Sequence, residues 1–323
     1  MEEIMGFAEV VNALLSESQS NAQQGKKFEK LIKAILQREM VLQNTFHIKK
    51  VYLWSEFSDK YHINRADFGI DIMIETHNDE FISVQCKAFK PEHTLSLGDV
   101  KNFLGINSIL NNKGDAVIKI SQSLLFCTCK GISNEVLKAL ETNANADKAK
   151  GQAYGYNELQ NLSINWEALE LNNIENSIQI KGKKSLRPHQ LEAFEAIKSH
   201  FLEQENERGK VIMACGTGKS LLAIRSIDYI VQSGEIALFL TPSLALTNQI
   251  IKEFFSQSES KHYEVFAVCS DKKVGSKIDN EDAKSNELCI APTTNALTLA
   301  NKIAQLIPQN TNHKEFMPPP PCI

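Results

Sequence analysis

The stretch Ala214-Cys-Gly-Thr-Gly-Lys-Ser220 decides how the second half of this chain is interpreted. It follows the apolar run 211–213 and precedes an apolar helical pattern that starts at position 221. Glycine at 216 and 218 lets backbone N–H groups turn inward around phosphate oxygens, lysine at 219 supplies a cation, and serine at 220 supplies a hydroxyl ligand for Mg²⁺. The alternative is a chance glycine turn between a strand and a helix. We predict a loop that binds a nucleoside triphosphate, built from Gly216, Thr217, Gly218, Lys219 and Ser220.

Apolar residues alternate between helical and strand-like spacing on both sides of this loop. Helical spacing covers 187–205, 219–232, 243–256 and 295–306, and strand-like runs cover 210–214, 237–241, 263–269 and 287–292. This alternation is typical of a parallel sheet covered by helices.

Two short motifs flank the loop. Leu186-Arg-Pro-His-Gln190 lies one predicted helix upstream, where helicase-type motors keep a glutamine that reads adenine, so Arg187 and Gln190 are expected to bind the nucleotide. Phe239-Leu-Thr-Pro-Ser243 ends the next predicted strand, where such motors contact nucleic acid. Each motif alone also fits a plain helix start or strand end. Their order favours a superfamily 2 helicase motor over a metabolic kinase.

Hydrolysis of ATP needs an acidic pair that holds Mg²⁺ and positions water. Beyond the loop no Asp-Glu pair closes an apolar strand, because Asn280-Glu281-Asp282 lies in a polar run. We therefore expect Mg²⁺ and ATP as cofactors, binding without hydrolysis, and a motor that the chain ends before completing.

The first half of the chain carries a second constellation of polar residues. Two period-two runs, 69–76 and 81–89, are joined by a polar turn and predict a hairpin. Asp71 lies on the first run, and Gln85 and Lys87 share one face of the second. Asp71 and Gln85 are candidate Mg²⁺ ligands, Lys87 is a candidate to orient the attacking water, and Glu29 on a helical pattern offers a further carboxylate. The alternative is an ordinary hairpin whose polar face is solvated.

Composition sets limits on these interpretations. The 323 residues are 42% hydrophobic and 23% charged, typical of about two globular domains, and the net charge of −4 gives no sign of a nucleic-acid partner. Seven scattered cysteines suggest reduced thiols and not a disulfide framework. No apolar stretch is long enough to span a membrane and the N-terminus is acidic, so we expect a cytoplasmic protein.

Several quoted stretches together resemble a known family. Asp67-Phe-Gly-Ile-Asp71 followed by Val84-Gln-Cys-Lys87 resembles the Mrr-type branch of the PD-(D/E)xK nucleases, in the form where glutamine replaces the second acid. The run 208–220, with Arg187-Pro-His-Gln190 and the stretches 165–166, 238–245 and 268–271, resembles the helicase portion of type ISP (single-polypeptide type I) restriction-modification enzymes. The resemblance covers about residues 25–299. Ser220 stands where these enzymes more often have threonine.

The resemblance implies a restriction-endonuclease-like α/β domain followed by a truncated, RecA-like parallel-sheet helicase lobe. We expect the nuclease domain at 1–145, a junction at 146–185, the partial lobe at 186–310 and an irregular tail at 311–323. Double-stranded DNA and ATP are the implied partners, with no membrane. No methylation motif of the Asn-Pro-Pro-Tyr kind and no target-recognition domain is found in the sequence, and the oligomeric state is open.

Three functions follow as hypotheses. The chain is the N-terminal part of an ATP-dependent restriction endonuclease with Mg²⁺-dependent cleavage of DNA, or a catalytically silent ATP- or DNA-binding module from a switched-off gene, or a self-contained P-loop regulator. The run Pro318–Pro321 is consistent with a cytosine tract in which slippage ends the protein early. Basic residues near the junction contact DNA phosphates or form a solvated linker; these are Lys181, Lys183, Lys184 and Arg187.

Overall fold

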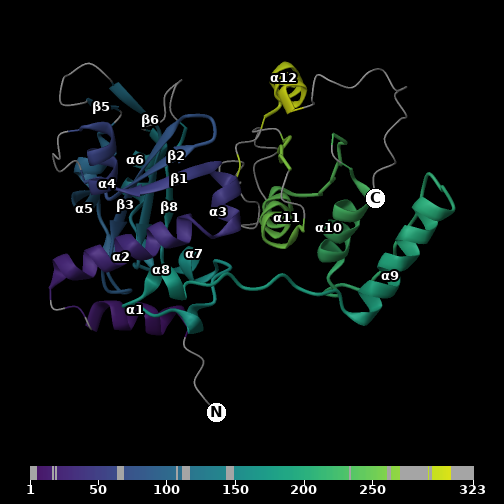
Figure 1. Ribbon diagram of the computed structural model, residues 1–323, viewed down its shortest axis with the longest axis horizontal. Helices are drawn as coiled ribbons and strands as arrows, with labels where there is room; N and C mark the ends of the chain where they lie inside the picture. Colours follow the sequence, from purple (N-terminus) through teal and green to yellow (C-terminus); the bar gives the residue numbers. More distant parts are fainter. Residues whose placement is uncertain are drawn as a thin grey trace, which may run out of the picture. The chain divides into compact units, whose positions relative to one another are not determined.

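A computed structural model of the chain describes residues 6–16, 18, 20–63, 69–106, 108–110, 117–142, 149–232, 234–259, 263–269, 290 and 293–306. The chain forms two compact units, Met1–Lys181 and Gly182–Ile323 (Figure 1). No helix among the described residues is long and apolar enough to cross a bilayer.

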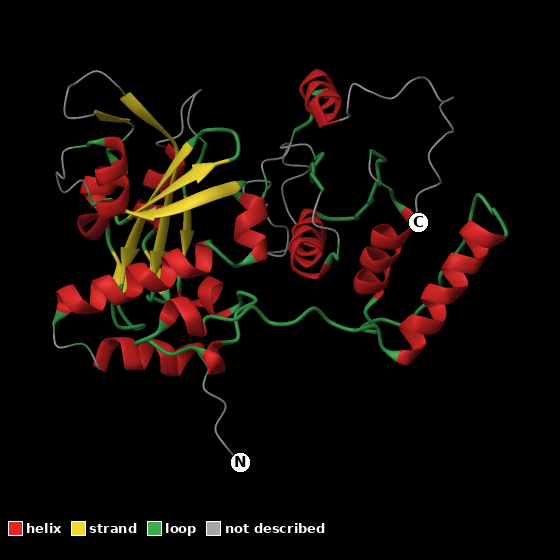
Figure 2. Ribbon diagram, in the orientation of Figure 1, coloured by secondary structure: helices red, strands yellow, loops and turns green. Residues whose placement is uncertain are grey.

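The first unit is built on a mixed six-stranded sheet, shown in yellow in Figure 2. Its strands are β1 (Ile48–Leu53), β2 (Ile72–Thr76), β3 (Phe81–Lys87), β5 (Ser108–Leu110), β6 (Val117–Cys127) and β8 (Gln152–Tyr154). The order is β1-β2-β3-β6-β5, and β8 also pairs with β6. The β2–β3 hairpin is antiparallel, whereas β3 and β6 run parallel. A separate parallel pair joins β4 (Thr94–Leu95) to β7 (Gly131–Ile132).

Helices cover both faces of this sheet (Figure 1). One face packs against α1 (Phe7–Ser16), α2 (Asn21–Leu36), α3 (Met40–Thr45) and the short helices α7 (Tyr156–Gln160) and α8 (Ile174–Ser177). The other face packs against α4 (Trp54–Tyr61), α5 (Leu97–Leu104) and α6 (Asn134–Thr142). Side chains alternate along β3 between these two layers, as the period-two pattern predicts, because Ile82, Val84 and Cys86 all lie in the α2-side core.

Much of the predicted junction at 146–185 belongs to the first unit. Strand β8 adds to the sheet beside β6, and Tyr156 and Trp166 are buried with their rings 5.0 and 4.8 Å from the ring of Phe7. The segment is mostly polar in sequence, so its few buried apolar residues did not stand out as part of a domain core. Residues 149–181 therefore extend the first domain beyond the predicted boundary at 145.

The second unit has the predicted helices at nearly the predicted positions. They are α9 (Pro188–Lys198), which continues into a π-helical turn (Ser199–Glu203), α10 (Lys219–Ile230), α11 (Leu244–Gln257) and α12 (Ala296–Leu306). The predicted strands differ. The described residues of 210–214, 237–241 and 263–269 belong to no strand ladder, although the carbonyl of Ala267 accepts the backbone N–H of Thr293 at 3.0 Å. Most of 287–292 lies outside the described residues. Ile212 is 82% exposed and Leu240 is 73% exposed. A strand is stable only when its backbone groups are paired, and in the part of the chain described here these runs lack a ladder.

Candidate functional site

The hairpin of the first unit places Asp71 and Gln85 opposite each other. The backbone N–H of Asp71 donates to the carbonyl of Val84 at 2.9 Å, and the next residue pair, Ile72 and Val84, is in register. The Asp71 carboxylate turns along β3 and accepts the backbone N–H of Cys86 at 2.7 Å. Cys86 lies between Gln85 and Lys87, so the carboxylate is held beside both predicted partners.

Gln85 is 4% exposed, and its amide oxygen has no hydrogen-bond partner among the described residues. Its amide nitrogen lies against Gly69, where a Cβ would stand only 3.0 Å away. Gly69 has φ +70°, a conformation that favours glycine, and it leaves room for the glutamine side chain. A buried amide oxygen without a donor is costly, and this oxygen is able to bind a cation or to accept a hydrogen bond from water.

Lys87 ends β3, and its partner in β6 is Cys127. It is half-buried on the same side of the strand as Gln85. The carboxylates of Asp71 and Glu29 and the ammonium of Lys87 all act on the thiol of Cys86, whose pKa is raised by burial first and then by the two carboxylates, with Lys87 opposing. Asp71, Gln85 and Lys87 therefore lie together at one end of β3, while Glu29 of α2 acts on the Cys86 thiol, which points to the α2-side core.

Glu29 is half-buried, and burial raises its pKa while Lys26 partly offsets that effect. A carboxyl group with a raised pKa is partly relieved of its desolvation cost when a cation binds nearby. The described residues contain no cluster of three or more His, Cys, Asp or Glu that would hold a metal. The predicted ligands are instead the Asp71 and Glu29 carboxylates and the Gln85 amide oxygen, which are hard oxygen donors of the type that Mg²⁺ prefers, and their binding of a cation stays a prediction.

The phosphate loop lies in the second unit, at the start of α10. Gly216 and Gly218 have φ +75° and +83°, so both need the conformational freedom of glycine. The Lys219 ammonium folds onto the carbonyls of Met213 and Ala214, at 3.3 and 3.0 Å, and the Thr217 hydroxyl donates to the carbonyl of Ala214 at 2.7 Å. Ser220 follows in the first turn of α10. The chain thus turns between 214 and 220 with Lys219 folded onto its own backbone, and the binding of a nucleotide there stays a prediction.

Gln190 contacts the phosphate loop directly. It is 2% exposed, and its amide nitrogen donates to the carbonyls of Thr217 and Gly218 at 3.1 and 3.0 Å. Its amide oxygen accepts the backbone N–H of Arg187 at 2.8 Å. The structure therefore joins Gln190 and the backbone of Arg187 to the loop, while the predicted contact of Gln190 with adenine stays a prediction.

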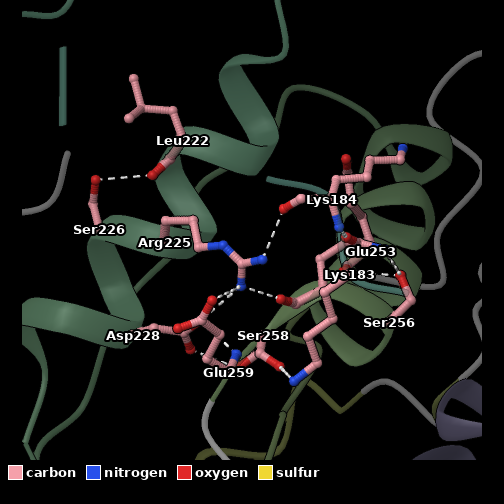
Figure 3. Close-up of polar contacts among 11 residues, drawn as sticks. Lys183, Lys184, Leu222, Arg225, Ser226, Asp228, Glu253, Ser256, Ser258 and Glu259 are labelled. Carbon is pink, nitrogen blue, oxygen red and sulfur yellow. Dashed lines mark hydrogen bonds and ion pairs between the residues drawn. The ribbon is translucent and has the colours of Figure 1, made fainter. Parts of the chain in front are cut away.

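A buried arginine, which carries no recognisable sequence signal, organises the second unit. Figure 3 shows the Arg225 guanidinium of α10 reaching the carbonyl of Lys184 and the carboxylates of Asp228 and Glu259. The guanidinium also donates to the carbonyl of Gln257. This contact fastens the basic segment 183–187 to α10 and to the end of α11. Arg225 belongs to no local motif, because its partners come from three separate parts of the chain.

The basic residues near the junction are differently placed. The Lys183 ammonium donates to the carbonyl of Ser258 at 2.6 Å, and the Lys184 backbone N–H donates to the Gln257 side chain at 2.8 Å. The side chains of Lys181, Lys184 and Arg187 are exposed, and their contact with DNA stays a prediction.

Comparisons with known proteins divide the chain in the same way. The family described as "Restriction endonuclease" matches residues 41–176, and the family described as "Type III restriction enzyme, res subunit" matches residues 183–316. A comparison with curated proteins finds no match. Among solved structures the chain is similar to "ATP-dependent Type ISP restriction-modification enzyme LlaBIII bound to DNA", with a TM-score of 0.66 and 22% sequence identity.

That similarity covers 93% of this chain and 18% of the LlaBIII chain, so the present sequence spans less than a fifth of the length of that enzyme. At this identity the similarity establishes a shared fold. The two family matches meet between residues 176 and 183, next to the boundary between the two units at Lys181 and Gly182. The chain therefore consists of an Mrr-like restriction endonuclease domain followed by a helicase region of the type III res-subunit family.

Proposed function

We propose that the first unit is a Mg²⁺-dependent endodeoxyribonuclease. The observation that supports this most directly is the buried amide oxygen of Gln85, which has no partner among the described residues and lies on the strand that also carries Lys87. Asp71 and Gln85 would hold the cation, and Glu29 would supply a further carboxylate from α2. When bound there, Mg²⁺ would supply Lewis-acid polarisation of the scissile phosphate.

Lys87 has the remaining task at this site. Its ammonium orients the attacking water and stabilises negative charge that develops on the phosphate as one P–O bond forms and the other breaks. Gln85, two residues away on the same face of β3, is buried, and a site shielded from bulk water strengthens the interaction of the ammonium with that charge. Double-stranded DNA is the proposed substrate, in keeping with the DNA to which the LlaBIII enzyme is bound in its solved structure.

A plasmid-nicking assay with Mg²⁺, with and without ATP, tests this function. The wild-type protein should convert supercoiled DNA to open circles, and Asp71→Ala or Lys87→Ala should abolish that conversion. Lys119→Ala is the matched control, because Lys119 is an exposed lysine of β6 at the other end of the β3–β6 ladder. Nicking by the wild type that survives in both site variants, or in excess chelator, would reject the proposal.

We also propose that the second unit binds ATP at residues 216–220. The support is the pair of left-handed glycines ahead of α10 together with Lys219, whose ammonium already lies over the loop backbone. Lys219→Ala should weaken binding of a fluorescent ATP analogue at least about tenfold, since a charge-assisted phosphate contact is lost. Lys210→Ala, an exposed lysine just before the loop, is the control and should bind as the wild type does.

A catalytically silent binding module is the second candidate. Exposed apolar residues in the runs 211–213 and 236–240 favour it, because a motor lobe needs those runs paired in a sheet to couple nucleotide to movement. This candidate predicts ATP or DNA binding without strand scission at any Mg²⁺ concentration. The same nicking assay separates the two functions.

A further inference from the structure

The end of β3 is held by a side chain that the proposed mechanism has not used. The regular β3–β6 ladder stops at the pair Lys87 and Cys127. Thr128, the first residue after β6, is fully buried, and its backbone N–H donates to the carbonyl of Lys87 at 3.1 Å. Thr128 therefore continues the contact with β3 one residue beyond the last ladder pair.

The Thr128 hydroxyl makes two further contacts with the same segment. It accepts the backbone N–H of Phe89 at 2.8 Å and donates to the backbone carbonyl of Phe89. One hydroxyl thus satisfies both backbone groups of a residue that is 39 positions away in the sequence. These are the groups that a paired strand would have satisfied.

A side chain of α2 also holds the segment that follows Lys87. The Gln24 side chain of α2 donates to the carbonyl of Ala88 at 3.1 Å. Further along, the backbone N–H of Lys130 donates to the carbonyl of Pro91 at 2.9 Å. Residues on both sides of Lys87 are consequently held at fixed positions, the near side by the ladder and the far side by Thr128.

We propose that Thr128 is a positioning residue for Lys87. By fixing Lys87 and Phe89 through three hydrogen bonds, it keeps the lysine on the same face of β3 as Gln85, at the end of the strand where Asp71 lies. Threonine suits this position because one hydroxyl both accepts and donates, whereas an apolar side chain of the same shape does neither. The inference rests on the proposed nuclease function, since it assigns Lys87 the role of ordering water.

Thr128→Val is the direct test, because it removes the hydroxyl and keeps the volume. We expect the nicking rate at saturating DNA to fall about 100-fold, as a displacement of about 1 Å at a catalytic group can do, while the DNA concentration at half-maximal rate stays unchanged. Thr128→Ser retains the hydroxyl and should keep most of the activity. A rate in Thr128→Val equal to the wild-type rate would overturn the proposal.

The matched control is Thr76→Val. Thr76 is also a buried threonine of the first unit, and its hydroxyl accepts the backbone N–H of Glu80 at 3.1 Å at the turn end of the hairpin. Thr76→Val should lower thermal stability by about as much as Thr128→Val does, and it should leave the nicking rate unchanged. Equal losses of rate in the two valine variants would mean that Thr128 acts through general stability alone, and the proposal would fail.

Competitive labelling of amines gives a readout that does not depend on cleavage. In folded Thr128→Val, Lys87 should react faster with an acylating reagent than in the wild type, relative to the exposed Lys101 of α5. If Lys87 labels faster in Thr128→Val than in the wild type but the wild type cuts no DNA, the nuclease function fails and the positioning of Lys87 stands. If labelling of Lys87 is identical in both proteins, the positioning role is refuted whatever the nicking assay shows.

Folding of the variant is checked by circular dichroism. Should Thr128→Val not fold, Thr128→Ala replaces it, because it removes the hydroxyl without placing an extra methyl group against Phe89. Failure of both variants to fold would also overturn the proposal, since the hydroxyl would then be required for the fold as a whole and not for the placement of one lysine.

Discussion

Substitution of Arg225 by methionine should open the second unit locally. The arginine is 8% exposed, and its guanidinium joins α10 to the carbonyl of Lys184 at 3.0 Å, to the carbonyl of Gln257 and to the Asp228 and Glu259 carboxylates at 3.7 and 3.3 Å (Figure 3). Methionine keeps most of the apolar stem and removes every one of these contacts.

The loss of stability in Arg225→Met depends on the hydrogen bonds and the solvent exposure that Asp228 and Glu259 keep. Removal of one member of a buried ion pair typically costs about 3–5 kcal/mol. Asp228 keeps its hydrogen bonds from the Ser258 hydroxyl and the Glu259 backbone N–H at 2.7 Å, and the Glu259 side chain is 68% exposed, so the lower end applies. A loss of about 3 kcal/mol corresponds to about a hundredfold increase in the local opening constant.

Hydrogen exchange followed by mass spectrometry measures this directly. Peptides covering 219–230 and 244–257 should exchange about a hundredfold faster in Arg225→Met, whereas peptides from α2 should be unchanged. Arg225→Lys should give an intermediate rate, because an ammonium keeps the charge but cannot reach several acceptors at once. Lys252→Met, an exposed lysine of α11, is the control. Exchange in Arg225→Met within about threefold of the wild type would refute the assignment of Arg225 as the central contact.

Two more predictions concern the first unit. Burial raises the pKa of Glu75, but hydrogen bonds from Tyr52, Lys49 and Lys60 outweigh it and hold the pKa at about 2, so its stabilisation is present above pH 4.5 and is lost as pH falls towards 2. Thermal melts of Glu75→Gln should therefore differ from the wild type at neutral pH and converge below pH 4.5; a gap that is independent of pH would contradict this. Gly69→Ala should cost about 1–3 kcal/mol in urea unfolding, because φ is +70° and the new methyl group would meet Gln85 at 3.0 Å. Gly105→Ala, where an added Cβ meets nothing within 4 Å, should have little effect and serves as the control.

The local features of both halves were predictable from the sequence. The period-two run 81–89 correctly predicted which side chains of β3 face the α2-side core, and the helices of the second unit begin within one residue of their predicted starts. The glycines at 216 and 218 have the left-handed conformation expected of a phosphate loop. These features depend on backbone geometry and side-chain period over a few residues, which neighbouring sequence specifies.

The sequence was less informative where burial depends on distant partners. The segment 149–181 reads as a polar junction, yet β8 and Trp166 complete the core of the first unit. The runs 210–214 and 237–241 have the composition of buried strands, yet they lie unpaired among the described residues of the second unit. Propensity is a weak guide in both cases, because pairing and packing across the chain override it.

In the candidate nuclease site, too, some residues could be predicted from local sequence and others only from the tertiary structure. Asp71, Gln85 and Lys87 are close in sequence, and the spacing of one hairpin is enough to place them at one strand end. Thr128 contacts that end from the position just after β6, Glu29 acts on the neighbouring Cys86 thiol from α2, and the partners of Arg225 come from three parts of the second unit. A side chain whose hydrogen-bond partner is tens of residues away produces no periodic pattern in the sequence. Its role can be recognised only in the folded chain, where the intervening loops have closed.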